Sequence, residues 1–149
     1  MQNAWKAVGV EVTLRTEPSR MLFGHTTKHR AFPGLVMYTW TSLVGESPRL
    51  TLGSAMVLSE ANNWRGANFT GFSDPEFDKA VDLSETELDP GRRRAAWATI
   101  QRIYAERLPA LPLFINAIPQ ALPTWLRGFG PNGTRQPFTQ RAELWRSEP

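Results

Sequence analysis

Aromatic and amide side chains form the group in this sequence that is best suited to holding a ligand. The group consists of Trp40, Asn62, Asn63, Trp64, Asn68 and Phe69. The rings offer flat apolar surfaces, and each amide can donate to a carbonyl and accept from an N–H without carrying charge. Such groups can hold a peptide main chain with little dependence on its side chains. The alternative, in which the aromatic residues are core and the Asn residues serve turns, is equally supported for each residue.

Two histidines have a spacing that some metal sites use. His25 and His29 are four positions apart, so on a helix they would share one face. No Glu follows His25 as it does in metalloprotease motifs, and no third Asp, Glu or Cys ligand is indicated nearby. We therefore interpret the pair as part of a polar surface turn, and we expect neither a metal ion nor another cofactor.

Catalytic patterns find little support. The serines lie in no G-x-S-x-G elbow, and only two histidines could act as bases. Carboxylates at helical spacing, such as Asp74 with Asp78 or Asp82 with Glu85, are explained by helix capping and solvated surface. The absence of cysteine excludes a thiol nucleophile, a disulfide and a Cys-type zinc site. We expect the chain not to be an enzyme, and a hydrolase ranks third among the hypotheses.

Two helices should follow the amide-rich segment. Ser73 and Glu76 match a capping box and Pro75 suits a first turn, so a helix is predicted to begin near Asp74. The same start signal recurs at Asp89. Apolar residues of the second helix recur at three- and four-residue steps and should share one face: Ala96, Trp97, Ile100, Ile103, Tyr104 and Leu108. Pro109 is expected to end this helix.

Shorter elements are predicted on the N-terminal side. We predict a helix end from Gln2 to Ala7, stopped by Gly9, and a short helix from Pro18 to Phe23. We predict a half-buried strand from Val10 to Leu14 and a buried strand from Leu35 to Trp40. This alternation favours a parallel or mixed sheet with helices packed on its faces.

The remaining segments give weaker patterns. Leu50 to Leu58 fits either a helix or an extended segment. Leu113 to Ala117 should form a strand, and Leu144 with Trp145 a last short one. Four prolines at positions 119, 123, 131 and 137 predict a loop-rich C-terminal tail.

The order of these residues resembles the C-terminal part of the family-5 extracellular solute-binding proteins, the peptide-binding receptors of bacterial ABC importers. The matching pieces are Asn68 to Phe72, Asp74 to Asp78, Asp89 with Arg93, Gln101 to Tyr104, and Leu108 to Phe114. The match extends loosely from Ala4 to Trp145. Because members of that family are several times longer and close two lobes on a ligand, the resemblance implies a fragment of a type II periplasmic-binding fold. That fold is α/β, with a mixed sheet, flanking helices and, here, a loop-rich C-terminal tail.

The resemblance also implies an organisation and a function. Residues 1–108 would be part of the C-terminal ligand-binding lobe, and residues 109–149 a return segment that joins the other lobe. The full-length parent would bind a peptide or similar small solute between its lobes by hinge closure and deliver it to an ABC permease. Its compartment would be periplasmic or extracellular, although this chain shows no signal peptide.

The expected ligand-binding residues combine residue type with position in the family. They are Trp40 as an apolar wall, Thr41, Ser42, Asn63 and Asn68 as hydrogen-bonding groups, and Trp64 or Phe69 for stacking. Oligopeptide receptors of the family often carry an acid just beyond the matching Trp, where it holds the free amine of the ligand. Here the first acid is Glu46. A neutral, blocked or non-peptide solute, or one whose cationic group reaches Glu46, is therefore comparably well supported.

Charge and hydropathy limit the classes of partner that this chain is expected to bind. The formal net charge is +3 with a pI near 9.8. The only cationic run is Arg92 to Arg94, so no stripe that could track phosphates is evident and we expect no nucleic-acid partner. The sequence contains no run of 18 apolar residues, so it predicts no membrane span. The alternative to solute binding is a self-associating structural or interaction module, driven by apolar surface that the rest of the parent would cover.

Overall fold

The computed structural model describes residues 1–40, 45–115, 119–130 and 138–148. Its helical elements are α1 (Gln2–Ala7), α2 (Ser19–Met21), the π-helical turn η1 (Leu22–Thr26), α3 (Arg49–Leu52), the 3-10 turns η2 (Ser54–Met56) and η3 (Glu60–Asn62), α4 (Pro75–Thr86), α5 (Pro90–Arg107) and the 3-10 segment η4 (Phe138–Leu144). The strands are β1 (Leu126–Arg127) and β2 (Arg146–Ser147). No helix among the described residues is both long and apolar enough to cross a membrane.

Helices α4 and α5 begin at aspartates, as the sequence predicts. The Asp74 carboxylate accepts hydrogen bonds from the N–H groups of Glu76 and Phe77 at 2.9 and 3.0 Å. Asp89 does the same for Arg92 at 2.8 Å. The predicted capping box is wrong in its first member, because the Ser73 hydroxyl donates to the Ser54 hydroxyl instead. Asp74 stands closer to the first free N–H groups of the helix, and its carboxylate is the better acceptor there.

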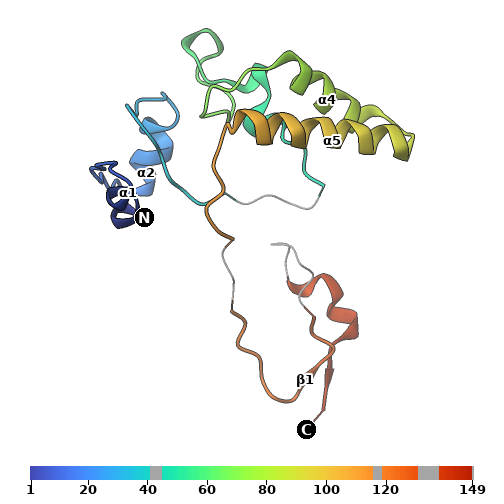
Figure 1. Ribbon diagram of the computed structural model, residues 1–149. Coiled ribbons are helices and arrows are strands. Elements are labelled where there is room, and N and C mark those ends of the chain that lie inside the picture. The colour runs from blue at the N-terminus through green and yellow to red at the C-terminus, as the bar shows by residue number, and fades with distance from the viewer. Residues whose placement is uncertain (41–44, 116–118, 131–137, 149) are drawn as a thin grey trace.

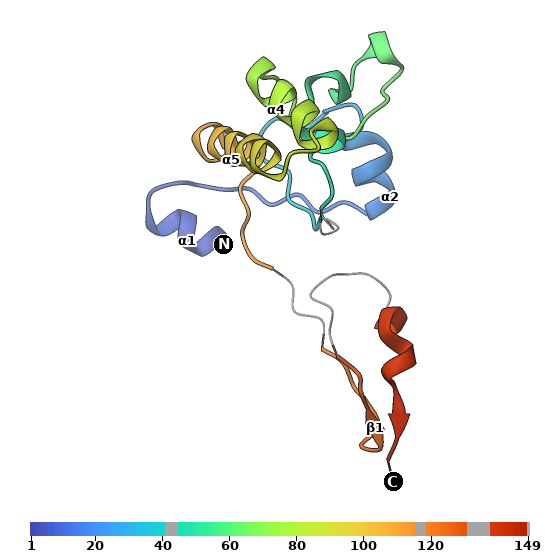
Figure 2. The same ribbon diagram turned by 90° about the vertical axis from the view of Figure 1, so that its right-hand side faces the viewer.

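The hydrophobic core lies between α4, α5 and α3. Its buried members are Leu52, Phe77, Ala80, Val81, Ile100 and Ile103, with Phe72, Trp97 and Tyr104 packed against them. Figures 1 and 2 show α4 and α5 side by side. The predicted apolar face of α5 is thus confirmed, except at Leu108. That residue caps the helix with a φ of 44° and is 56 % exposed, because the left-handed turn before Pro109 carries its side chain away from the helix face.

The N-terminal helices agree with the sequence. α1 covers Gln2–Ala7 as predicted, and Gly9 follows it with a φ of +83°. The short helix predicted from Pro18 to Phe23 is present as α2, which continues into η1. The segment from Leu50 to Leu58, for which two readings were open, contains the helical turns of α3 and η2.

The predicted strands are mostly wrong. Residues 10–14, 35–40 and 113–115 belong to no strand in the structure, and the rest of Leu113 to Ala117 lies outside the described residues. Leu144 ends η4 and the last strand begins one residue after Trp145. A strand exists only when another segment satisfies its backbone N–H and C=O groups, and these apolar segments have no ladder partner in the part of the chain that is described.

The sheet that does form is small and local. β1 and β2 pair antiparallel, with Leu126 opposite Ser147 and Arg127 opposite Arg146. The expectation of a parallel or mixed sheet is therefore wrong for the described residues, although the chain does combine helices with a small β-sheet. In both views residues 119–130 and 138–148 lie away from the helical part of the molecule (Figures 1 and 2).

Candidate functional site

Four aromatic side chains from three separate segments meet beside the helical core. Phe23 comes from η1, Tyr38 and Trp40 from residues 35–40, and Phe69 from the loop before α4. Their ring centroids are 5.5 Å apart for Phe23 and Tyr38, 6.1 Å for Tyr38 and Trp40, 6.0 Å for Tyr38 and Phe69, and 6.2 Å for Trp40 and Phe69. Every pair is edge-to-face, the arrangement that the ring quadrupoles favour. We call these four residues the aromatic cluster.

The aromatic cluster contains two of the residues that the sequence predicts for a ligand site, Trp40 and Phe69. Trp40 is 44 % exposed and Phe23 is 40 % exposed, so part of the cluster faces solvent. Tyr38 is half-buried, and this burial raises the pKa of its phenol, which stays protonated and able to donate a hydrogen bond. The cluster can therefore offer apolar ring surface and a neutral hydroxyl, but no charge of its own.

Sequence reasoning missed Phe23 and Tyr38. Tyr38 stands two positions from Trp40, and that spacing on an extended segment is a signal that could have grouped them. Phe23 has no local signal, because it reaches the cluster from a helical turn that is distant in sequence.

Asn68 lies in a different environment from the one predicted for a ligand-binding amide. It is 0 % exposed, and its amide nitrogen donates to the carbonyls of Gly53 and Phe72 at 3.0 and 2.8 Å. Its amide oxygen accepts from the Thr70 hydroxyl at 2.9 Å and from the Gly71 N–H at 3.0 Å. With both donors and two acceptor positions used inside the protein, this side chain holds the loop and presents no polar atom to a ligand.

Further hydrogen bonds fix the loop that carries Phe69. The Ser54 N–H donates to the Asp78 carboxylate at 3.0 Å, and the Asp74 N–H donates to the Ser54 hydroxyl at 3.2 Å. Gly66 has a φ of +129°, and a Cβ at this position would lie 2.2 Å from the carbonyl oxygen of Met56. Only glycine lets the loop pass so close to η2.

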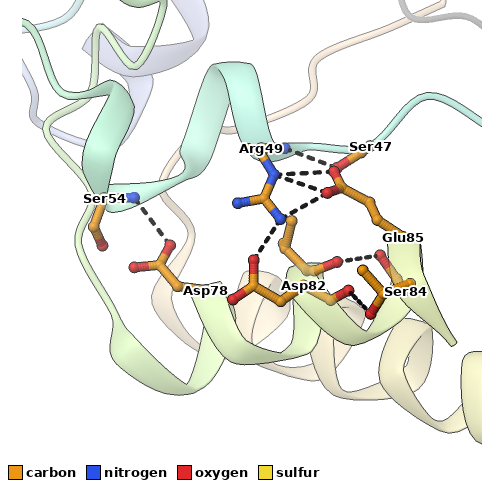
Figure 3. A network of polar contacts seen from close by, with 9 residues as sticks. Ser47, Arg49, Ser54, Asp78, Asp82, Ser84 and Glu85 are labelled. Atoms are coloured by element: carbon orange, nitrogen blue, oxygen red, sulfur yellow. Dashed lines mark hydrogen bonds and ion pairs between the residues drawn. The ribbon is translucent and has the colours of Figure 1, made fainter.

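An ion network anchors the start of this region to α4 (Figure 3). Arg49 donates to Glu85 from Nε at 2.9 Å and from Nη2 at 2.7 Å, and its Nη2 also donates to Asp82 at 2.5 Å. Hydrogen bonds from Arg49 and Ser47 hold the pKa of the Glu85 carboxyl below its ordinary value, while Glu85 and Asp82 raise the pKa of Arg49. We call these residues, Arg49, Asp82 and Glu85, the Arg49 network, and its role is to position α3 on α4.

Asn63 and Trp64 are consecutive turn residues, and neither is a member of the aromatic cluster. Both have left-handed backbone conformations, with φ values of 53° and 56°, where the chain turns after η3. Asn63 is an exposed turn residue. The ring of Trp64 packs against the ring of His29, with centroids 4.7 Å apart. The remaining predicted site residues, Thr41 and Ser42, lie outside the described residues.

A separate shallow groove of about 410 Å³ runs between α4 and α5. Small and apolar side chains, including Ala80, Leu83, Ala95 and Ala96, line it together with charged residues. None of the residues that the sequence predicts for ligand binding contributes to this groove. It is an opening between the two helices and not part of the aromatic site.

The described residues include no cluster of three or more His, Asp or Glu side chains arranged to hold a metal ion. Nor does any buried side-chain polar atom in this part of the chain lack a hydrogen-bond partner. The described residues thus present a partly exposed aromatic cluster on a scaffold whose buried polar side chains are hydrogen-bonded. Comparison with protein-family models, with curated proteins and with solved structures finds no match for this chain.

Proposed function

We propose that this chain is the C-terminal part of a solute-binding receptor, in which a peptide or similar small solute packs against the aromatic cluster before delivery to an ABC permease. The observation that carries the proposal is the assembly of Phe23, Tyr38, Trp40 and Phe69 from three segments, with Trp40 still 44 % exposed. A partly exposed group of rings suits the apolar wall of a ligand site.

The chemistry of the aromatic cluster limits the kinds of solute that it can bind. Its four side chains carry no charge, and burial keeps the Tyr38 phenol protonated. Such a wall stacks on apolar groups, can donate one hydrogen bond and attracts a cation by about 0.5–1 kcal/mol at an exposed site, but it gives no ion pair to a free amine. The proposed ligand is thus a neutral or N-terminally blocked peptide, or a non-peptide solute of similar polarity.

The proposed fold of the whole receptor is the type II periplasmic-binding fold. Residues 1–108 would belong to its ligand-binding lobe and residues 109–149 to the return segment. The apolar segments at residues 10–14 and 35–40 support this assignment, because strand-like sequences without a ladder partner here would gain partners in a larger sheet. The receptor works by hinge closure in the periplasm or outside the cell, without catalysis.

Calorimetric titration of the full-length receptor with free and N-acetylated peptides tests the proposal. We expect acetylated peptides to bind at least as well as free ones, and Trp40→Ala to weaken binding by about tenfold or more, since buried aromatic anchors dominate binding energy. Trp125→Ala is the matched control, because Trp125 is similarly exposed at 49 % but directly precedes β1, which lies away from the helical part of the molecule (Figure 1). A receptor that binds no peptide would discard the peptide substrate class, and an equal loss of binding in both variants would discard the proposed site.

A second candidate function is self-association, and a different observation favours it. Leu111, Leu113, Phe114 and Ile115 are 65, 48, 77 and 97 % exposed on one extended segment. Contiguous exposed apolar side chains of this kind typically mark an interaction surface. In this alternative the chain is a structural or interaction module whose partner is a second copy of itself.

A further inference from the structure

His25 lies in η1, and His29 lies in the turn that follows it. η1 is π-helical, and the Thr27 N–H donates to the carbonyl of Leu22, five residues back, at 2.8 Å. The His29 N–H donates to the carbonyl of His25, four residues back, at 2.8 Å, and side chains four positions apart in such a helical turn lie on one face. The imidazole rings of His25 and His29 accordingly lie with their centroids 4.9 Å apart and their planes tilted by 42°. The sequence spacing predicted a shared face only if these residues were helical, and the structure shows that they lie in helical turns.

One hydrogen bond fixes the protonation pattern of His29. Its Nδ1 lies 3.1 Å from the carbonyl oxygen of His25. A carbonyl can only accept, so Nδ1 carries the proton, and in the neutral ring Nε2 keeps its lone pair. Metal-binding histidines are oriented in the same way, by donating their other ring N–H to a backbone carbonyl or carboxylate. His29 is therefore prepared to act as a ligand through Nε2.

Neighbouring side chains restrict the turn further. The ring of Trp64 packs edge-on against His29, at a centroid distance of 4.7 Å. The buried Thr27 hydroxyl donates to the Leu22 carbonyl at 2.9 Å, which ties the backbone between the two histidines. His25 remains exposed to solvent. One imidazole is thus held in place while the other can complete a chelate from the solvent side.

From this geometry we propose that His25 and His29 form a two-histidine surface site for a divalent first-row transition ion, which binds Cu²⁺ more tightly than Ni²⁺ or Zn²⁺. Imidazole suits all three ions, and their order in sites of this type places Cu²⁺ first. Water, or donor atoms of a bound molecule, completes the coordination. Structural zinc sites use four protein ligands and catalytic sites use three, so a two-histidine site holds its ion more weakly than either and takes more of its ligands from water. This proposal does not depend on the proposed function.

Calorimetric titration with Cu²⁺ alone measures the site directly. The chain has two histidines and no cysteine, so the double variant His25→Ala, His29→Ala contains neither an imidazole nor a thiol. We expect one ion per chain, and a loss of affinity of at least about tenfold in each single variant, because even partners that only orient a ligand contribute that much. The matched control exchanges His25 with Lys28, as His25→Lys with Lys28→His, which preserves composition, charge and the Trp64 contact but makes the two histidines adjacent, so that they no longer share a face.

Fluorescence locates the bound ion. Cu²⁺ at the histidine pair should quench Trp64, which contacts His29, and most of the quenching should be lost in Trp64→Phe. Circular dichroism of each variant checks that it is folded. The proposal is overturned if the exchange variant binds Cu²⁺ as tightly as the unmodified chain, or if quenching is unchanged in Trp64→Phe.

Discussion

At the scale of single residues, burial separates side chains that residue type alone treats as equivalent. Asn63 and Asn68 were both predicted to bind ligand, but Asn63 is in an exposed left-handed turn and Asn68 is enclosed. An amide serves a ligand or a loop equally well, so its chemistry cannot distinguish the two roles. Hydrogen bonding within the protein decides the role of Asn68.

Replacing Asn68 should therefore reduce stability strongly. We expect Asn68→Ala to lower the free energy of unfolding by about 2–4 kcal/mol, because it removes four hydrogen bonds and leaves buried carbonyls without donors. Urea unfolding followed by circular dichroism measures the change. The control is Asn63→Gly, which should change stability by about 0.5 kcal/mol or less, since glycine accepts the φ of 53° readily. Equal effects of the two substitutions would contradict the structural role of Asn68.

At the scale of elements, local signals suffice for the long helices and fail for the segments that need partners. α4 and α5 start at Asp74 and Asp89 because a carboxylate there satisfies N–H groups two and three residues on. α3 has only four residues, too few to be stable alone. The Arg49 network holds it on α4, through contacts between residues more than 30 positions apart that no local pattern reveals.

The Arg49 network should make stability depend on pH. Hydrogen bonds from Arg49 lower the folded-state pKa of Glu85 below its ordinary value of 4.5. A lowered carboxyl pKa stabilises the folded state above the unfolded value, and that contribution is lost as the pH falls through the folded value. We expect Glu85→Gln to lower the free energy of unfolding at pH 7, and its difference from the unmodified chain to shrink steadily below pH 4.5.

Denaturant unfolding at a series of pH values measures that difference. The control is a double-mutant cycle in which Glu85→Gln is repeated in an Arg49→Gln background. If Arg49 is the cause, Glu85→Gln has a much smaller effect there. The proposed role is contradicted if the difference does not depend on pH or if Glu85→Gln has its full effect in the Arg49→Gln background. The Arg49–Glu85 ion pair would then add nothing measurable to the free energy of unfolding, as is found for many exposed ion pairs.

At the scale of the whole molecule, the helical part and the C-terminal segment are stabilised separately. The helical part has its own buried core. The C-terminal segment pairs β1 with β2, and the Phe129 and Trp145 rings pack with centroids 5.8 Å apart. Between them, residues 111–115 expose a row of large apolar side chains. Such a row is unfavourable in water and favours a covering partner.

Self-association should therefore depend on this exposed row. We expect the mass from light scattering to rise with protein concentration, and Phe114→Lys or Ile115→Lys to return it toward the monomer value, because a charge opposes burial of the surface. Leu88→Lys is the control: Leu88 is 88 % exposed but lies between α4 and α5, away from the row. A monomer at every concentration would exclude the self-associating module.

The sequence by itself determined the features that depend on near neighbours in the chain: the starts of α4 and α5, the apolar face of α5 and the short N-terminal helices. It also grouped Trp40 with Phe69, whose rings the structure brings together. Only the tertiary structure decided that Phe23 and Tyr38 join them, that Asn68 is enclosed, and that residues 10–14 and 35–40 do not form strands. The reason is physical: caps and helix faces are set within a few residues, whereas strand pairing, burial and ring contacts depend on segments that only folding brings together.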